Sequence, residues 1–259
     1  MTDKKPVILV MAGHDPSGGA GIQADIEAIV RNGCHAASII TALTIQNTSV
    51  FIKSIPVNPD DFQKQIDILL ADLQINACKI GLIADPGILL VIEKKLTSLQ
   101  NIPVVIDPVI SAGGGERMQT EDICVSLFEK LTPFSTVITP NSIEARQLSG
   151  MNNLDDAAAE FLKHGCSAVL ITGTHEQTEK VINTLYLNNE APLHYEWDRL
   201  PGKYHGSGCT LASTIAAQLA LGKDIKQAVY IAQEYTWHTL KQGILLGKTQ
   251  IHPNRFYIS

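Results

Sequence analysis

The chain has 259 residues, of which 45% are hydrophobic and 18% are charged, a composition typical of soluble globular proteins. Its net charge is −6 and it contains no run of five like charges, so we expect neither nucleic acid nor an anionic membrane as a partner. No apolar stretch reaches the roughly 18 residues of a membrane span, and the first apolar run is too short for a signal peptide.

The number and spacing of the cysteines indicate the cellular compartment and whether a zinc site is expected. The five cysteines are odd in number and widely spread, and no CxxC motif occurs. This pattern predicts neither a disulfide framework nor a zinc site. We therefore expect a protein of the reducing cytoplasm.

Short apolar runs alternate with amphipathic segments through the first two thirds of the chain. The runs predict strands at 6–12, 37–44, 77–82, 103–109, 136–141 and 168–173. The segments between them predict helices that begin at 22 and stop at 32–33, and that span 60–73, 86–99, 120–131 and 155–164. Such alternation is typical of an α/β fold with a mainly parallel sheet.

The pattern changes after residue 173. Segments 181–187 and 194–197 predict two strands joined through Asn188-Asn189, which indicates an antiparallel hairpin at one edge of the sheet. Two helices are predicted at about 209–221 and 224–242. No Gly/Ser-rich linker divides the chain, so residues 1–259 are predicted to form a single domain.

Polar residues stand where the predicted parallel strands end. Ligands of open α/β sheets bind beyond the carboxyl ends of the strands, so these residues should share one rim. They include His14, Gln46, Lys79, Asp107, Asn141 and Thr172.

Gly206-Ser207-Gly208-Cys209 is a glycine-rich turn that directly precedes a long run of helix formers. Unpaired N–H groups at a helix start, together with the helix dipole, form a natural phosphate site. Cys209 would lie in the first helical turn, where a thiolate is favoured. The alternative is a plain junction between loop and helix with a buried cysteine.

Three further groups suggest ligand chemistry. The Gln46 amide offers both a donor and an acceptor to the edge of a heterocycle, or belongs to a simple turn cluster. Asp107 and Glu144, with Asn141 one helical turn before Glu144, suit magnesium held largely through water. Glu144 is otherwise an acid favoured at a helix start. His205 is singled out only by its position beside the glycine-rich turn.

Two nucleotide-binding motifs are absent. The chain has no GxxxxGK[ST] sequence, so it is not a P-loop ATPase, and no GxGxxG follows the first strand. The glycine-rich loop 15–21 permits close approach to a ligand, or forms a tight turn before a helix that carries Asp25. Residues 110–118 are the expected lid.

Six stretches together resemble one known family. They are Ala12–Asp25, Thr41–Thr48, Lys79–Gly81, Asp107–Val109, Thr139–Ala145 and His205–Thr210. In order and spacing they resemble the bacterial hydroxymethylpyrimidine/phosphomethylpyrimidine kinases of thiamine biosynthesis. The resemblance implies a ribokinase-like three-layer α/β/α sandwich that phosphorylates 4-amino-5-hydroxymethyl-2-methylpyrimidine and its monophosphate with ATP and Mg²⁺. It also implies a homodimer.

The resemblance also implies a role for each matching position. The pyrimidine would contact Gln46, Ala12, Gly13, Asp25 and Lys79. Asp107 and Glu144 would hold the metal through water, next to nucleotide and phosphate contacts at Asn141, Thr172 and Gly173. Gly206, Ser207, Gly208 and Cys209 would form the catalytic anion hole, and Cys209 would act as the base or orient the hydroxyl.

Two departures from the family pattern keep alternatives open. Gly113 and Thr172 stand where the family usually has lysines near the ATP phosphates, and Arg117 or Lys203 is a candidate substitute. A pyridoxal or pyridoxine kinase of the same superfamily is the nearest alternative. An alternative of another class is a pyrimidine-binding protein with impaired catalysis.

Overall fold

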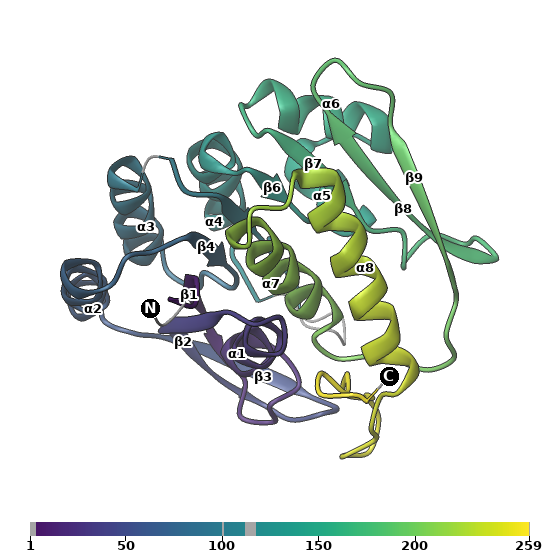
Figure 1. Cartoon of the computed structure of the whole chain (residues 1–259), viewed down its shortest axis with the longest axis horizontal. Coiled ribbons are helices and arrows are strands. Elements are labelled where there is room, and N and C mark those ends of the chain that lie inside the picture. Colours follow the sequence, from purple (N-terminus) through teal and green to yellow (C-terminus); the bar gives the residue numbers. More distant parts are fainter. Residues whose placement is uncertain (1–3, 100, 112–117, 259) are drawn as a thin grey trace.

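The computed structural model describes residues 4–99, 101–111 and 118–258 of the chain. Its strands are β1 (Val7–His14), β2 (His35–Gln46), β3 (Phe51–Pro56), β4 (Ala77–Ile80), β5 (Val104–Ile106), β6 (Val137–Ile138), β7 (Ala168–Ile171), β8 (Lys180–Leu187) and β9 (Leu193–Asp198). Within the described residues they form one sheet in the order β3-β2-β1-β4-β5-β6-β7-β8-β9 (Figure 1). The central strands from β2 to β7 pair in parallel, and β3, β8 and β9 are antiparallel edges.

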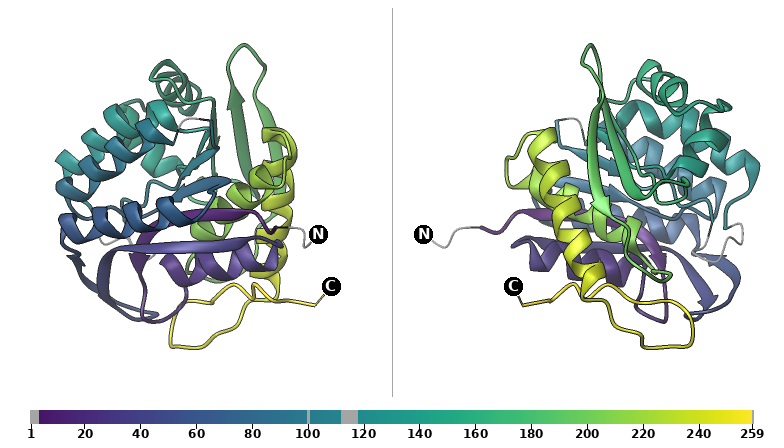
Figure 2. Two further views of the ribbon diagram at one scale, coloured as in Figure 1. Left: turned by 60° about the vertical axis from the view of Figure 1, so that its left-hand side comes forward. Right: turned by 90° about the vertical axis from the view of Figure 1, so that its right-hand side faces the viewer.

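Helices cover both faces of this sheet (Figure 2). Buried side chains of α1 (Gly21–Arg31), α7 (Ser207–Ala220) and α8 (Ile225–Lys241) pack on one face. Those of α2 (Pro59–Asp72), α3 (Pro86–Ser98), α4 (Glu121–Ser126), α5 (Ser142–Ser149) and α6 (Leu154–Lys163) pack on the other. A π-helical turn at Leu127–Leu131 and a 3₁₀ turn at Thr132–Phe134 follow α4. The predicted three-layer α/β/α arrangement is confirmed.

The central strand β1 shows why the apolar runs predicted a parallel sheet. Ile8 and Val10 belong to the core beneath α1 and α7, whereas Leu9 and Met11 belong to the core beneath α2 and α3. All four side chains are fully buried. A strand covered on both faces has no polar alternation, which is the pattern seen in residues 6–12.

Two elements were missing from the prediction. Strand β3 adds an antiparallel edge beside β2, and most of its side chains are exposed, so it lacks the apolar run that marks the central strands. Helix α5 begins directly after Asn141 and has only eight residues, too few for a clear helical stripe. The predicted hairpin of β8 and β9 is confirmed.

The segment after α8 returns to the rim of the sheet. The N–H groups of Lys248 and Gln250 bond to Thr48, in the turn between β2 and β3. Residue 251 then runs beside Lys203 and Tyr204, just before α7. No described helix has the length and apolar character needed to cross a membrane.

Candidate active site

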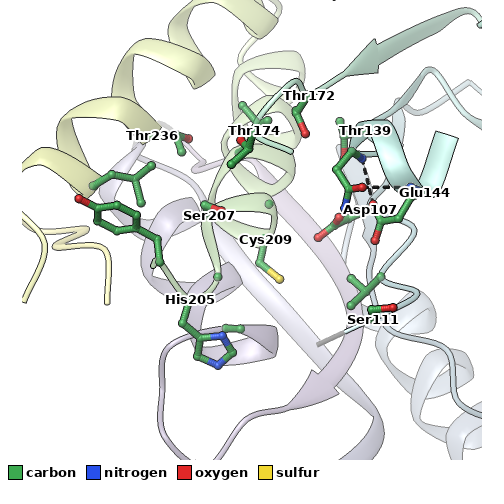
Figure 3. Close-up of a pocket in the computed structure, with 18 of the residues that line it drawn as sticks. Asp107, Ser111, Thr139, Glu144, Thr172, Thr174, His205, Ser207, Cys209 and Thr236 are labelled. Atoms are coloured by element: carbon green, nitrogen blue, oxygen red, sulfur yellow. Dashed lines mark hydrogen bonds between the residues drawn. The ribbon is translucent and has the colours of Figure 1, made fainter. Parts of the chain in front are cut away.

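A cavity of about 740 Å³ opens at the carboxyl ends of the parallel strands, where the polar residues were expected to gather. Figure 3 shows the start of α7, with Ser207 and Cys209, facing Asp107 and Glu144. The predicted site residues that line the cavity are Ala12, Gly13, Gln46, Lys79, Asp107, Asn141, Glu144, Thr172, Gly206, Ser207, Gly208 and Cys209. Asp25 and Gly173 do not line it.

The glycine-rich turn begins α7 as the sequence indicates. Gly206 is the N-cap residue in the left-handed region, with φ of 76°, and the helix starts at Ser207. The N–H of Thr210 bonds to the Gly206 carbonyl, which closes the first helical turn. The N–H groups of residues 207–209 precede any intrahelical partner, so they are available to an anion in the cavity.

The predicted thiolate at Cys209 is not supported by its surroundings. Burial raises the pKa of the thiol well above its usual value, the nearby Lys79 ammonium lowers it, and the Asp107 and Asp25 carboxylates raise it further. Desolvation and two negative charges therefore outweigh the lowering effect that a helix start has on the pKa of a thiol. At neutral pH Cys209 carries its proton. Burial raises the pKa of Asp107 above its usual value and the Asp25 charge raises it further, against the opposing effects of the Lys79 ammonium and of a side-chain hydrogen bond with Cys209.

Beneath the turn lies a buried charge cluster that the sequence did not reveal. The Lys79 Nζ lies 2.8 Å from Asp25 Oδ1 and 4.0 Å from Asp107 Oδ2. Ser213, in α7, donates a hydrogen bond of 2.7 Å to Asp25. Lys79 and Asp25 are completely buried, and of the two only Lys79 lines the cavity. Asp25 therefore supports the cavity floor through Lys79.

Asp107 is the carboxylate best placed to receive a cation. It lies just past β5, is 5% exposed, and its Oδ2 is buried without a hydrogen-bond partner among the described residues. No group of three His, Cys, Asp or Glu side chains in the described part of the chain could enclose a metal. A cation at Asp107 would therefore keep most of its ligands as water, as Mg²⁺ usually does.

Glu144 and Asn141 are engaged mainly with the backbone. Asn141 caps α5 by accepting bonds from the N–H groups of Ile143 and Glu144. One Glu144 oxygen accepts the N–H of Asn141, and the other accepts that of Ile110. This capping box corresponds to the structural alternative considered for Glu144. Burial, and then the Asp107 charge, raise the pKa of Glu144 to about 8.

The segment after β7 contributes Thr172 but not Gly173. Thr172 lines the cavity and pairs with residue 141 and its neighbours through the backbone. The Gly173 N–H instead donates to the Asn183 side chain. A Cβ at Gly173 would lie 2.1 Å from the Ile182 carbonyl oxygen, so this glycine permits the close approach of β8. The phosphate contact expected at Gly173 therefore has no structural support.

The two ends of the cavity differ in chemistry. Gln46 ends β2 at one end, near His14 and Thr44, and its amide has no hydrogen-bond partner within the described residues. Trp197 and Trp237 line the other end, with ring centroids 6.2 Å apart. Their indole N–H groups bond to Gln233 and to the Asp198 carbonyl, which leaves the rings as apolar walls.

The aromatic end was not found by sequence reasoning, because Trp197 and Trp237 are 40 residues apart on β9 and α8. Thr236 also lines this end. Its Oγ1 is buried and has no hydrogen-bond partner among the described residues. The hydroxyl is therefore available to a polar atom of a ligand that enters between the helix and the hairpin.

Comparison with known proteins decides the family. The family model described as "Phosphomethylpyrimidine kinase" matches residues 15–254. The chain belongs to the phosphomethylpyrimidine kinase family. A hydroxymethylpyrimidine/phosphomethylpyrimidine kinase of Bacillus subtilis is 33% identical, over 96% of this chain and 94% of the relative.

Two other similar proteins show the range of this family. A kinase of the same description from Saccharomyces cerevisiae is 34% identical over 97% of this chain, which spans only about half (49%) of the yeast protein. The crystal structure of an ADP complex of Bacillus subtilis pyridoxal kinase has a TM-score of 0.87 and 30% identity, covering 97% of this chain and 98% of that one. The phosphomethylpyrimidine kinase family and a pyridoxal kinase thus share this fold.

The cations near the cavity differ from those that the resemblance led us to expect. Thr172 brings no charge, and Gly113 and Arg117 lie outside the described residues, as does most of the expected lid. Lys203 lines the cavity and is exposed. Arg199 also lines it, but its guanidinium donates to the carbonyls of residues 174, 176 and 178.

Proposed function

We propose that this chain transfers the γ-phosphoryl group of ATP to the hydroxymethyl group of 4-amino-5-hydroxymethyl-2-methylpyrimidine, and then phosphorylates the monophosphate to the pyrophosphate. The observation that carries the proposal is the single cavity that contains the Gln46 amide, the α7 turn, the unpartnered Asp107 oxygen and the tryptophan pair. Membership of the family supports the same reaction.

The acceptor end of the proposed site is built on β1 and β2. The Gln46 amide would pair with the aminopyrimidine edge, because it offers one donor and one acceptor. Ala12 and Gly13 line the same wall, and a Cβ at Gly13 would meet the Leu82 side chain at 2.8 Å. The pyrimidine ring would lie against this wall, close to the backbone of Gly13, with its hydroxymethyl group directed at the α7 turn.

Cys209 would orient the acceptor hydroxyl. Its thiol is neutral near pH 7, so we assign the sulfur a hydrogen-bonding role rather than that of a preformed base. The hydroxyl oxygen forms a bond to the γ-phosphorus while the bond from that phosphorus to the ADP oxygen breaks. The hydroxyl proton ends on an oxygen of the transferred phosphoryl group, from which solvent removes it. Such a reaction depends mainly on positioning and on charge stabilisation.

Phosphate binding would combine the turn with cations. The N–H groups of residues 207–209 would meet the charge that develops on the γ-phosphoryl group. Asp107 fits Mg²⁺ through its unpartnered Oδ2, and the bound metal would supply charge neutralisation for the ATP phosphates. Lys203 would take the place of the absent lysines.

The nucleobase would enter the aromatic end. We expect it to lie against Trp237, with the Thr236 hydroxyl bonding to a polar atom of the nucleoside. Trp237→Ala should raise the KM for ATP by about 5- to 150-fold, since stacking on an aromatic ring contributes about 1–3 kcal/mol per base. Tyr230→Ala is the matched control, because Tyr230 contacts Trp197 but does not line the cavity. If both variants changed the KM for ATP equally, the nucleobase would not bind at this end of the cavity.

Incubation with the pyrimidine alcohol, ATP and Mg²⁺, with products resolved by mass, tests the reaction directly. Monophosphate followed by pyrophosphate is the expected result. The likeness to a pyridoxal kinase favours pyridoxal as a second candidate substrate, and a competition assay with both alcohols ranks them by kcat/KM. Pyrimidine binding by calorimetry without any product would instead identify a binding protein with impaired catalysis.

We further propose that residues 1–259 form one domain that acts in the cytoplasm as a homodimer. The face formed by β2 and β3 supports the dimer, because it exposes Leu43, Ile45, Ile52 and Ile55 by 41–67%. Leu43 and Ile55 are direct partners across the two strands, so their apolar side chains are neighbours on this exposed face. Sedimentation analysis of the purified chain should give twice its mass of 28.1 kDa.

A further inference from the structure

A buried hydrogen bond joins the loop after β1 to the segment that precedes α7. His205 Nε2 lies 2.8 Å from Asp15 Oδ2, although the two residues are 190 positions apart in the chain. Asp15 is 1% exposed and His205 is 6% exposed. The bond therefore connects two walls of the cavity: the loop that continues from Gly13 and His14, and the turn that presents the amides of residues 207–209.

Asp15 is held firmly on its own side of this contact. Its carboxylate also accepts bonds from the Ser17 N–H, the Ser17 hydroxyl and the Ala20 N–H. Burial alone would raise its pKa, but the bonds from His205 and Ser17 lower it to about 2. The carboxylate is thus ionised and only accepts, so His205 Nε2 must carry the hydrogen of the shared bond.

The backbones of the two segments also touch. A Cβ at Gly206 would lie 1.9 Å from the Gly19 carbonyl oxygen, and a Cβ at Gly19 would lie 2.3 Å from the His205 ring. Neither position could carry a side chain without moving one segment away from the other. The place of the turn therefore depends on the place of the loop, with no layer of side chains between them to absorb a shift.

Arg255, near the end of the chain, fastens the same two segments. Its guanidinium donates to the Gly19 carbonyl and to Thr210 Oγ1, in the first turn of α7, and it forms a salt bridge of 3.0 Å with Glu27. Arg255 is 2% exposed. It holds the two segments together beside the Asp15–His205 bond. On the cavity side that bond acts together with a backbone hydrogen bond of Gly21 to the Cys209 sulfur.

We propose that Asp15 and His205 are positioning residues for phosphoryl transfer, whose hydrogen bond sets the place of the α7 turn relative to the acceptor wall. The inference rests on the proposed kinase function. A positioning role differs from a substrate-binding role, because the turn amides that the bond positions act chiefly on the charge that develops in the transition state. Displacing them should lower kcat while leaving the KM for both substrates nearly unchanged.

The test uses four variants of the full chain, assayed where circular dichroism shows each one folded. His205→Ala and Asp15→Ala should each lower kcat by about 100-fold, the loss typical of one oxyanion-hole donor, with KM values within about 3-fold of wild type. His205→Gln retains an N–H donor and should recover most of kcat. The double variant should lose no more than the worse single variant, because both changes break one bond.

Tyr186→Phe is the matched control. It also removes a hydrogen bond to a carboxylate, 2.7 Å long between the buried Tyr186 of β8 and the exposed Asp155, and neither residue lines the cavity. Its kcat should equal that of the wild type. The inference is overturned by a rise in KM at constant kcat, by additive losses in the double variant, or by equal losses in His205→Gln and His205→Ala.

The wild type distinguishes this inference from the proposed function. If the wild type phosphorylates the pyrimidine alcohol and the variants match it, only the positioning role fails. If the wild type phosphorylates pyridoxal alone, the proposed acceptor fails and the variant series is measured with pyridoxal. A wild type that turns over neither alcohol overturns both.

Discussion

The buried pair of Lys79 and Asp25 yields the sharpest stability prediction. In Lys79→Met, a side chain of similar length replaces the ammonium, so the volume beneath the turn stays filled. Asp25 then keeps only the Ser213 hydroxyl as a bonding partner. The carboxylate would remain completely buried, with Asp107 as a second negative charge nearby. The protein must hold an uncompensated charge or protonate it.

The expected loss is large for a single substitution. Removing one partner of a buried ion pair costs about 3–5 kcal/mol, against a total stability of about 5–15 kcal/mol for a typical domain. At about 2–4 °C per kcal/mol for a protein of this size, Tm should fall by about 6–20 °C. Urea unfolding at pH 7, with wild type and variant at equal concentration, measures the free energy directly.

The double variant Lys79→Met/Asp25→Asn separates lost charge pairing from lost packing. It removes both charges but keeps an oxygen for Ser213, so it should recover at least half of the lost stability. The Asp25 charge raises the pKa of Lys79 above its usual value despite the opposing effect of burial. The wild-type contribution of Lys79 is therefore complete below the unfolded pKa of about 10.4, and any fall in the deficit of Lys79→Met toward low pH would report protonation of the stranded Asp25 carboxylate. A deficit below about 1 kcal/mol, or no recovery in the double variant, would refute this reasoning.

Three further substitutions test the α7 turn and the proposed cation site at Asp107. Gly206→Ala should cost more than about 1 kcal/mol of stability, and more than Gly222→Ala at the other end of α7, where φ is also positive but the space is open. Cys209→Ala should lower kcat by up to about 10-fold with unchanged substrate binding, since one lost hydrogen bond costs about 0.5–1.5 kcal/mol, and an unchanged kcat would contradict the orienting role. Asp107→Asn should strengthen metal-free ATP binding in calorimetry but abolish most turnover with Mg²⁺, and an unchanged metal dependence would contradict the cation site.

The sequence predicted the parallel sheet well, since burial on both faces leaves a direct mark. Runs such as residues 6–12 and 103–109 are apolar because helices cover both sides of β1 and β5. The half-exposed β3 lacks that mark. Because parallel strands end on the same side of a sheet, the sequence also predicted that Gln46 and Asp107 lie near each other. Both line the cavity together with the α7 turn.

At the site, the features that the sequence did not predict depend on contacts between distant segments. The resemblance placed Asp25 in the pyrimidine pocket, whereas in the structure its side chain faces Lys79 and does not line the cavity. Gly173 has its N–H bonded by Asn183 on the next strand. The partner of His205 is 190 residues away. The spacing of residues in the sequence indicates which side chains are candidates for the site. The packing of α1, β4 and β8 then decides which of these side chains reach the cavity.

The charges beneath the turn determine what the cavity can bind. One ammonium, that of Lys79, faces two carboxyl groups, those of Asp25 and Asp107, so the cluster carries one excess negative charge when both are ionised. Burial raises the pKa of Asp107, and a cation beside it would favour the ionised form. The α7 amides offset only about half a charge. ATP phosphates would therefore be repelled unless a divalent cation joins Asp107, which converts the local excess to one positive charge. With no lysine at Thr172, this cation carries most of the attraction, so metal binding and nucleotide binding should be tightly coupled.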